Sequence, residues 1–327
     1  MKNIAFIINP VSGTLNKRRI PKLIDKLLDR QQWMPDIVFT EYKGHAIELA
    51  RHYAALGFNA VVAVGGDGTV NEVASGLRGT NTALGVIPIG SGNGFARHLG
   101  TPLRVTNAIE ALNHMTPVRC DYGLANDHPF FVTCGTGFDA SISEEFQKAG
   151  ARGLRTYVQQ IVKHIFSYQP EHYTLQYSPT KVVSNSSPKV GEVARSDGGV
   201  WTTAGAFSPQ DGLSTLEGDA FLITFANCNQ WGNAAVIAPK ASIQDGLLDV
   251  VVCSPFPLIL APGLALSLFT KTIDQGLYVS SLKTRQLTLH RDAPAPFHLD
   301  GDPIQMGTDI HIRVVEDGLW VLAPKRF

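Results

Sequence analysis

The residues best suited to chemistry lie in one glycine-rich segment near the start of the chain. An apolar, mostly β-branched run at residues 61–64 (VVAV) precedes residues 65–68 (GGDG), and a helix-like apolar pattern follows over residues 70–77. These patterns predict a buried strand, a turn and a helix. Glycines let the backbone approach a ligand closely, and the N–H groups at a helix start face an anion. The segment is therefore typical of a phosphate site, although a βα turn without a ligand would carry the same glycines.

Asp67 lies in the middle of this turn, where a simple anion pocket would avoid a carboxylate. Its presence makes sense if a divalent cation or a nucleophilic hydroxyl binds at the same place. Asp67 is therefore a candidate for chemistry as well as for binding.

Three other polar turns follow predicted strands in the first third of the chain. Strands are predicted at residues 4–8, 36–40 and 84–88, and the turns after them hold residues 9–13 (NPVSG), Thr40 and residues 89–94 (IGSGNG). Thr101-Pro102 predicts the start of a further helix, with Thr as its cap. Repeated β-α units imply a parallel, doubly wound sheet, in which ligands bind outside the carboxyl ends of the strands. Four polar turns at one edge favour a nucleotide site.

The pattern changes after about residue 121, where strand-like runs dominate. These runs lie at residues 130–134, 173–177, 220–226, 247–253, 286–290, 297–299 and 310–315, with an amphipathic helix at 153–166. We predict an α/β plus β fold in two domains. A doubly wound parallel-sheet domain covers residues 1–121, rejoined in one alternative by residues 316–327, and a mostly antiparallel β-sandwich domain covers residues 122–315. Residues 178–216, rich in Ser, Gly and Pro, are interpreted as a long mobile insertion.

Composition limits the classes of function. The 327 residues, 44% of them hydrophobic and with a formal net charge of zero, are expected to form a soluble globular protein that does not bind nucleic acid. The four cysteines match no zinc or CxxC pattern, so free buried thiols are expected. Because the first residues run directly into a predicted strand, we expect no signal peptide. No apolar run is long enough to span a membrane. The nearest is Pro255–Phe269, which is interpreted as a wall for an acyl chain, an interfacial anchor or a core segment.

The motifs together resemble those of one enzyme family. They are NPVSG at 9–13, GGDGTVNEV at 65–73, IPIGSGNGFAR at 87–97, GTGFDA at 135–140, NQWGNAAVIAPKASIQDGLLDV at 229–250 and HLDGD at 298–302. The chain is similar to the diacylglycerol kinase catalytic-domain family, which includes bacterial lipid kinases and the sphingosine and ceramide kinases. The resemblance covers nearly the whole chain apart from residues 178–216.

The resemblance implies a kinase that uses ATP and Mg²⁺, with the nucleotide in the cleft between the two domains and a lipid hydroxyl as acceptor. Matching positions assign ATP contacts to Asn9, Ser12, Gly13, Thr40, Gly65, Gly66, Asp67, Gly68, Thr69, Val70, Asn71, Ser91, Gly92 and Asn93. Phosphoryl transfer depends mainly on positioning and charge stabilisation, so backbone N–H groups, hydroxyls and Mg²⁺ suffice.

Two acids are implied for the chemical step. In bacterial members the general base is the acid that ends an Asp-Gly-Glu motif, which corresponds to Asp302, one methylene shorter than the family residue. In sphingosine-kinase-like members the acid of the glycine turn is implicated, which corresponds to Asp67. We predict that the two form the chemical pair and leave their division of roles open. Without the resemblance, Asp302 would be interpreted as part of a hairpin turn.

For the other positions that match the family, a functional and a structural interpretation both remain open. Asp139 matches the contact to the polar head of the substrate in the sphingosine branch, or is a structural turn acid. Ser242, Asp245 and Leu247 match a structural Mg²⁺ site of some bacterial members, or form a plain Asp-Gly turn. Gly94, where bacterial members usually carry Asp, favours a sphingoid base or another single-chain lipid over diacylglycerol.

We therefore predict a cytoplasmic enzyme of lipid metabolism, an ATP-dependent lipid kinase that associates peripherally with the membrane surface where its lipid substrate lies. A homodimer is left open. One alternative is another nucleotide kinase such as an NAD kinase, because GGDGT recurs there. The other is a non-catalytic lipid- or nucleotide-binding relative.

Overall fold

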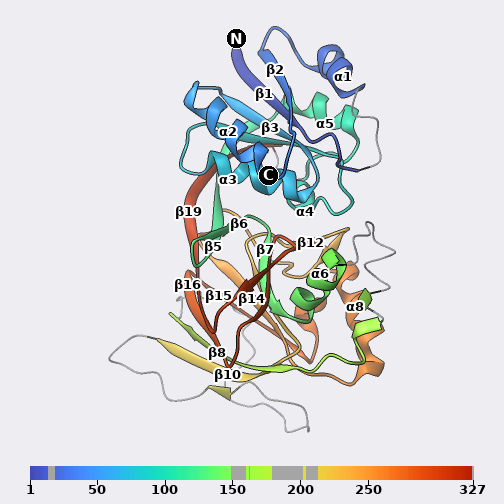
Figure 1. Ribbon diagram of the computed structural model, residues 1–327, viewed down its shortest axis with the longest axis vertical. Helices are drawn as coiled ribbons and strands as arrows, with labels where there is room; N and C mark the ends of the chain where they lie inside the picture. Colours follow the sequence, from blue (N-terminus) through green and yellow to red (C-terminus); the bar gives the residue numbers. More distant parts are fainter. Residues whose placement is uncertain (14–18, 149–159, 162, 179–201, 204–212, 326–327) are drawn as a thin grey trace.

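The computed structural model describes residues 1–13, 19–148, 160–161, 163–178, 202–203 and 213–325. Figure 1 shows the N-terminal strands and helices gathered at one end of the molecule and the β-rich half at the other. The long strand β19 (Asp309–Ala323) runs from the second half into the first. The C-terminus therefore lies beside the N-terminal half.

The N-terminal half contains a four-stranded parallel sheet with helices on both faces. Its strands are β1 (Lys2–Ile8), β2 (Trp33–Phe39), β3 (Ala60–Gly65) and β4 (Ala83–Pro88), in the order β2-β1-β3-β4. Its helices are α1 (Ile20–Leu27), α2 (His45–Ala55), α3 (Asp67–Leu77), α4 (Gly94–His98) and α5 (Val105–Leu112). Since side chains alternate along a strand, one face of the sheet packs on α2 and α3 and the other on α1 and α5. The predicted doubly wound sheet is confirmed.

One predicted helix start is wrong. The Thr101-Pro102 pair was expected to begin a helix, but α5 begins at Val105. Gly100 has a positive φ of 69° and the N–H of Thr101 donates to the carbonyl of Ala96, which closes the end of α4 instead. The chain then stays non-helical as far as Arg104.

The C-terminal half is antiparallel, as predicted. Its strands are β5 (Thr116–Ala125), β6 (His128–Phe130), β7 (Thr133–Gly137), β8 (Glu171–Tyr177), β9 (Thr202–Thr203), β10 (Ser214–Ala220), β11 (Leu222–Ala226), β12 (Gln230–Gly232), β13 (Ala235–Val236), β14 (Leu248–Cys253), β15 (Val279–Thr284), β16 (Gln286–Arg291), β17 (Ala295–Leu299), β18 (Asp302–Met306) and β19. A six-stranded sheet in the order β15-β14-β11-β7-β17-β18 faces the strands β16, β8 and β10 across a buried apolar core.

Strand β19 joins the two halves into one large sheet. It pairs with β16 and β5 in antiparallel fashion and, at Val321, with Leu84 of β4 in parallel fashion. Only residues 310–315 were expected to form this strand. The pairing with β5 shifts register between Val315 and Leu319, where an irregularity interrupts the ladder without ending the strand.

Several other segments differ from the expectation. Helices α6 (Phe138–Lys148) and α8 (Ala261–Thr270) and the short helices η2 (Leu258–Leu260) and η3 (Ile273–Gln275) were not predicted. The predicted helix at 153–166 and the predicted insertion at 178–216 lie largely outside the described residues, and the part of the insertion from Ser214 belongs to β10. All four cysteines are free and buried, as expected.

Candidate functional site

The turns that follow β1, β3 and β4 meet at the carboxyl edge of the parallel sheet. The amide of Asn9 donates to the hydroxyl of Thr69 at 3.0 Å, and the N–H of Ile89 donates to the carbonyl of Gly65 at 2.9 Å. A Cβ atom on Gly90 would lie 2.6 Å from the Cα of Gly66, closer than any side chain tolerates. Glycine is thus required where the two turns touch.

Asp67 connects the first glycine turn, at residues 65–68, to the second, at residues 89–94. Its Oδ2 accepts the N–H of Asn93 at 2.8 Å and its Oδ1 accepts the N–H of Gly94 at 2.7 Å. Burial raises the pKa of Asp67, and these two N–H donors act in the opposite direction. Both carboxylate oxygens therefore already bind backbone, and the acid has a structural task in the turn.

Asn93 gives the second turn its shape. Its φ of 52° lies in the left-handed region that Asn tolerates better than most residues. Its side chain is buried and bonds Gly90 twice, accepting from the N–H at 3.1 Å and donating to the carbonyl at 2.8 Å. The turn is therefore fixed before any ligand binds.

Beside the two glycine turns, the candidate site contains a third component, the hairpin of β17 and β18. Its two-residue loop, Asp300-Gly301, has positive φ at both positions, 51° and 89°, as a type I′ turn requires. The loop carries Asp300 and is followed at once by Asp302, the first residue of β18. The hairpin that the sequence allowed as an alternative is therefore present, and it holds two acids with different surroundings.

Asp300 is a residue that the sequence analysis missed. Its carboxylate accepts backbone N–H groups from three consecutive residues, Phe131 at 2.9 Å, Val132 at 2.8 Å and Thr133 at 3.1 Å. It also accepts the side-chain amide of Asn71 at 2.8 Å. Burial raises the pKa of Asp300 and the four donors oppose that shift. Since Asn71 lies on α3, Asp300 ties the hairpin to the glycine-turn helix.

Asp302 has an open environment. Its side chain is 67% exposed, and its Oδ2 lies 3.6 Å from the ammonium of Lys43. Lys43 lies between β2 and α2, beside Gly44, whose N–H donates to Glu72 of α3 at 2.9 Å. The hairpin thus reaches the same edge of the parallel sheet as the predicted nucleotide residues.

The remaining predicted nucleotide residues lie in these same turns. The N–H of Thr40 donates to the carbonyl of Ile8 at 3.0 Å, and that of Ser12 donates to the carbonyl of Asn9 at 3.4 Å. Ser91 is exposed in the second glycine turn. The geometry therefore gathers residues from all four predicted turns, while Asp139 and the residues 242–247 lie elsewhere.

Asp139 is buried at the start of α6 together with His298 of β17. The Nε2 of His298 lies 3.0 Å from Oδ2 of Asp139, and the hydroxyl of Thr224 donates to the same oxygen at 3.3 Å. The other oxygen accepts the N–H of Ala140 at 2.8 Å. Next to this pair lies an apolar cluster formed by Phe138, Ile142, Phe221, Leu222, Ala226, Ile237, Ala238, Ala241, Val251, Cys253, Ile273 and Val279.

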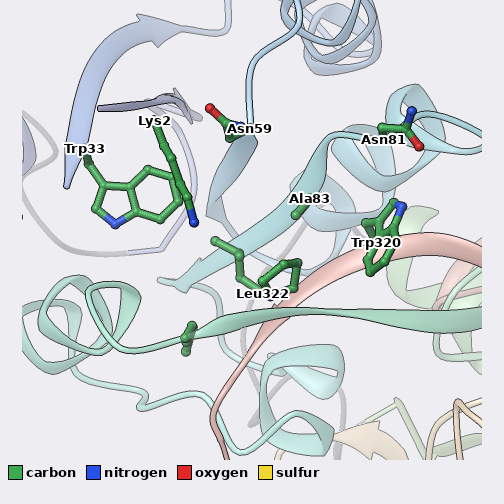
Figure 2. A pocket seen from close by; sticks show the side chains of 9 residues that line it. Lys2, Trp33, Asn59, Asn81, Ala83, Trp320 and Leu322 are labelled. Atoms are coloured by element: carbon green, nitrogen blue, oxygen red, sulfur yellow. The ribbon is translucent and has the colours of Figure 1, made fainter.

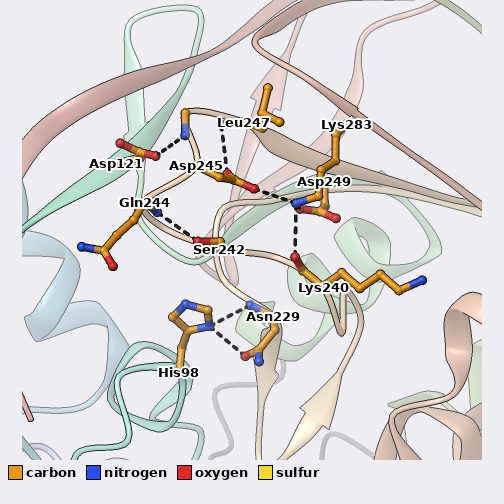
Figure 3. Close-up of polar contacts among 11 residues, drawn as sticks. His98, Asp121, Asn229, Lys240, Ser242, Gln244, Asp245, Leu247, Asp249 and Lys283 are labelled. Carbon is orange, nitrogen blue, oxygen red and sulfur yellow. Dashed lines mark hydrogen bonds and ion pairs between the residues drawn. The ribbon is translucent and has the colours of Figure 1, made fainter. Parts of the chain in front are cut away.

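The loop between β13 and β14 holds the predicted metal residues (Figure 3). The hydroxyl of Ser242 accepts the N–H of Gln244 at 3.3 Å, and Oδ1 of Asp245 accepts the N–H of Leu247 at 3.1 Å. The other oxygen of Asp245 lies 2.9 Å from the ammonium of Lys283. Burial opposes the charge on Lys283, but its neighbouring carboxylates outweigh burial and raise its pKa.

A groove of about 300 Å³ lies at the opposite end of the parallel sheet (Figure 2). Its lining residues are Lys2, Trp33, Asn59, Asn81, Ala83, Met115, Pro117, Trp320 and Leu322. Lys2, Trp33 and Ala83 are the first residues of β1, β2 and β4, so the groove faces the amino ends of these strands. None of the predicted nucleotide residues lines it.

Comparison with known proteins adds a family relation to this geometry. The model of the diacylglycerol kinase catalytic domain matches residues 3–125, and that of the YegS C-terminal NAD kinase beta sandwich-like domain matches residues 132–322. A protein named "Probable lipid kinase YegS-like" from Chromohalobacter salexigens is 27% identical over 266 residues, which are 80% of this chain and 75% of that protein. A protein of the same name from Yersinia enterocolitica is 27% identical over 290 residues, 86% of this chain and 84% of the relative.

Solved structures agree on the fold. The crystal structure of a diacylglycerol kinase from Bacillus anthracis superposes with a TM-score of 0.67 at 15% sequence identity, covering 99% of this chain and 98% of that one. The likeness therefore extends over both halves and their arrangement.

Proposed function

The chain belongs to the diacylglycerol kinase family of YegS-like lipid kinases, and from this premise we propose that it transfers the γ-phosphate of ATP to the hydroxyl of a membrane lipid. The observation that carries the proposal is the meeting of the glycine turns with the β17–β18 hairpin. Through the 2.8 Å contact between Asn71 and Asp300, a phosphate-binding edge and a pair of acids come together from the two halves of the chain.

The nucleotide fits the edge formed by the turns after β1, β3 and β4. The close approach of Gly66 and Gly90 leaves backbone rather than side chains at the surface there. The start of α3, an eleven-residue helix, adds the positive end of its dipole. Mg²⁺ bound together with ATP would neutralise part of the charge on the phosphates. Asn9, Thr69 and Asn71 offer side-chain polar groups beside this edge.

Asp302 is the general base in this proposal, and Asp67 and Asp300 are positioning residues. The lipid hydroxyl gives its proton to the carboxylate of Asp302 while its oxygen forms a bond to the γ-phosphorus. The bond from that phosphorus to the β–γ bridging oxygen breaks, and ADP leaves with the electron pair. Asp302 suits the role because its carboxylate is exposed, whereas both oxygens of Asp67 bind N–H groups.

We propose that acyl chains contact the apolar surface of η2 and α8, which lies beside the cluster next to Asp139. Leu264 and Leu268 of α8 pack against this cluster, while other side chains of η2 and α8 face outward. Among these, Ile259 is 85% exposed, Leu266 62% and Phe269 56%. An apolar surface of this kind suits the boundary of a bilayer. No helix in the described residues is long and apolar enough to cross a membrane.

The surroundings of Asp139 favour an uncharged acceptor such as diacylglycerol over a sphingoid base. An ammonium that enters an apolar site needs an open carboxylate, but Asp139 is buried and already bonded to His298, Thr224 and the N–H of Ala140. A neutral hydroxyl lipid makes no such demand. Gly94, which favoured a single-chain lipid in the sequence, has little room for a larger residue, because a Cβ there would lie 3.3 Å from Val132.

The proposal is tested by offering radiolabelled ATP with diacylglycerol, sphingosine or NAD to the purified protein, and by identifying the product of a total lipid extract by mass. Labelled phosphatidic acid with little labelled sphingosine is expected. A labelled NAD product would make it an NAD kinase instead. Binding of ATP with no transfer to any lipid would favour a non-catalytic relative.

Membrane contact is tested separately with phospholipid vesicles. Ile259→Ser combined with Phe269→Ser removes one outward apolar side chain from η2 and one from α8 and should lower co-sedimentation. The variant should keep its activity on short-chain diacylglycerol dispersed in detergent. The exposed Leu56→Ser, on the N-terminal half, is the matched control. Equal vesicle binding of the double variant and the control would refute the docking surface.

A further inference from the structure

Lys283 places a positive charge inside the loop that follows β13 (Figure 3). Its ammonium lies 2.7 Å from Oδ2 of Asp249, 2.9 Å from Oδ2 of Asp245 and 3.2 Å from the carbonyl oxygen of Lys240. An ammonium has three N–H donors, and each finds an oxygen here. The loop is thus closed around a cation that belongs to the chain itself.

The backbone fixes Lys283 in this place. Strands β14 and β15 pair in antiparallel register, and Asp249 lies directly opposite Lys283. The Lys283 side chain is 22% exposed and that of Asp249 is 9% exposed, so water screens the pair only weakly. The position of the ammonium therefore follows from strand pairing and does not depend on a flexible surface side chain.

This donor set does not suit the structural Mg²⁺ that the family resemblance implies at Ser242, Asp245 and Leu247. The one carboxylate of that set has both oxygens engaged, Oδ1 by the N–H of Leu247 and Oδ2 by Lys283. A divalent ion on Asp245 would lie close to the ammonium and be repelled by it. In the described residues no group of three or more His, Cys, Asp or Glu side chains could hold a metal ion.

We propose that Lys283 is the resident cation of this loop and takes the place of a structural metal ion. The loop is anchored to strand β5 by two hydrogen bonds. The N–H of Gly246 donates to the carboxylate of Asp121 at 2.8 Å, and the N–H of Asp121 donates to the carbonyl of Ile243 at 2.7 Å. Because this anchoring depends on the shape of the loop, the loop needs a cation between its acids. Removal of the ammonium leaves the carboxylates of Asp245 and Asp249 beside the carbonyl of Lys240. Such a set of hard oxygens takes a divalent cation.

The test is thermal unfolding without nucleotide, in EDTA or in excess Mg²⁺, Ca²⁺ or Mn²⁺. The wild type should unfold at the same temperature in all of these. Lys283→Met, which keeps the length of the side chain and loses its charge, should unfold at a lower temperature in EDTA and recover part of the loss in a divalent cation. Lys240→Met is the matched control, because its exposed ammonium forms an ion pair with Asp274 at 2.9 Å and its backbone carbonyl stays in place. It should show no dependence on divalent cations.

A rise in the unfolding temperature of the wild type with Mg²⁺ would overturn the proposal, and so would a Lys283→Met variant whose loss no divalent cation restores. If that variant does not fold, Mn²⁺ binding followed by electron paramagnetic resonance decides the matter on the wild type and on Asp245→Asn. Equal signals from the two proteins are expected, whereas Mn²⁺ bound by the wild type and lost in Asp245→Asn would contradict the proposal. Because no nucleotide or lipid is present, these results are independent of the proposed kinase activity.

Discussion

The two regions that meet at the proposed active site are built in different ways. The edge of the parallel sheet consists of backbone turns held in contact by glycines, as at Gly66 and Gly90. The β17–β18 hairpin instead brings side chains, the carboxylates of Asp300 and Asp302, to that edge. One region suits an anion whose charge is spread over many oxygens, and the other suits a single proton transfer.

The acids of the two regions show how surroundings divide their tasks. Asp67 and Asp300 bind backbone N–H groups through both oxygens, so each holds a turn in place. Within the described residues, the carboxylate of Asp302 has one ion-pair partner, Lys43 at 3.6 Å, and the side chain is 67% exposed. The oxygens of Asp67 and Asp300 are occupied by N–H donors, whereas those of Asp302 are accessible to a substrate hydroxyl. The comparison predicts different consequences when each acid is changed.

Asp302→Asn should cause the largest loss. Without a base the turnover number should fall at least about a hundredfold, which is typical of a positioned general base, while the unfolding temperature stays the same because the side chain is exposed. Steady-state kinetics with the identified lipid and a thermal melt measure both quantities. Asp302→Glu, which restores the acid that the family usually carries, should remain active, and the exposed Asp309→Asn serves as control. Near-normal turnover of Asp302→Asn would remove Asp302 from the mechanism.

Asp300→Ala should reduce both stability and activity. The change leaves the N–H groups of Phe131, Val132 and Thr133 without their acceptor, which should lower the free energy of unfolding by about 2 kcal/mol. It also breaks the contact to Asn71. Urea unfolding gives the stability, and Asn71→Ala isolates the link between the halves because it leaves those three N–H groups bonded. A variant that loses activity but no stability would mean that Asp300 acts on the substrate directly.

Asp67→Asn should act mainly on nucleotide binding. The new NH₂ group would face the N–H of Asn93 or Gly94, two donors that cannot bond each other, so the second glycine turn should loosen. We expect the KM for ATP to rise about tenfold, the effect of losing roughly one charge-assisted hydrogen bond, with a smaller change in turnover. The opposite pattern, a large fall in turnover at an unchanged KM, would make Asp67 the base.

Much of the N-terminal half could be predicted because its signals are local. A buried strand, a glycine turn and a helix follow one another within 20 residues or so, and the turns must meet because parallel strands share one carboxyl edge. Residues 61–64 and 84–88 are strands, as predicted, and the contact between Gly66 and Gly90 follows from their adjacency.

The C-terminal half could be predicted only in outline because its decisive contacts are distant in sequence. Asp300 was overlooked because its side-chain partner, Asn71, is 229 residues away and an Asp-Gly pair looks like an ordinary turn. The length of β19 was missed because residues 316–318 (EDG) look like the end of a strand. The structure instead accommodates them as an irregularity in the ladder. Lys283 carries no signal at all in the sequence, since strand pairing places it opposite Asp249 and thereby beside Asp245.

The smallest expected effect concerns a contact between the two halves, that of His98 in α4 with Asn229 (Figure 3). The Nδ1 of His98 accepts the backbone N–H of Asn229 at 3.2 Å, and burial lowers the pKa of His98 below its usual 6.5. A lowered pKa in the folded state means that the unfolded chain takes up the proton first, so stability is complete above pH 6.5 and falls as the pH drops toward the folded value. His98→Gln should reduce this loss of stability at low pH, as measured by urea titrations at a series of pH values. The substitution His52→Gln, at an exposed position, should leave the loss unchanged. An equally steep loss of stability with falling pH in the wild type and His98→Gln would show that this contact does not sense pH.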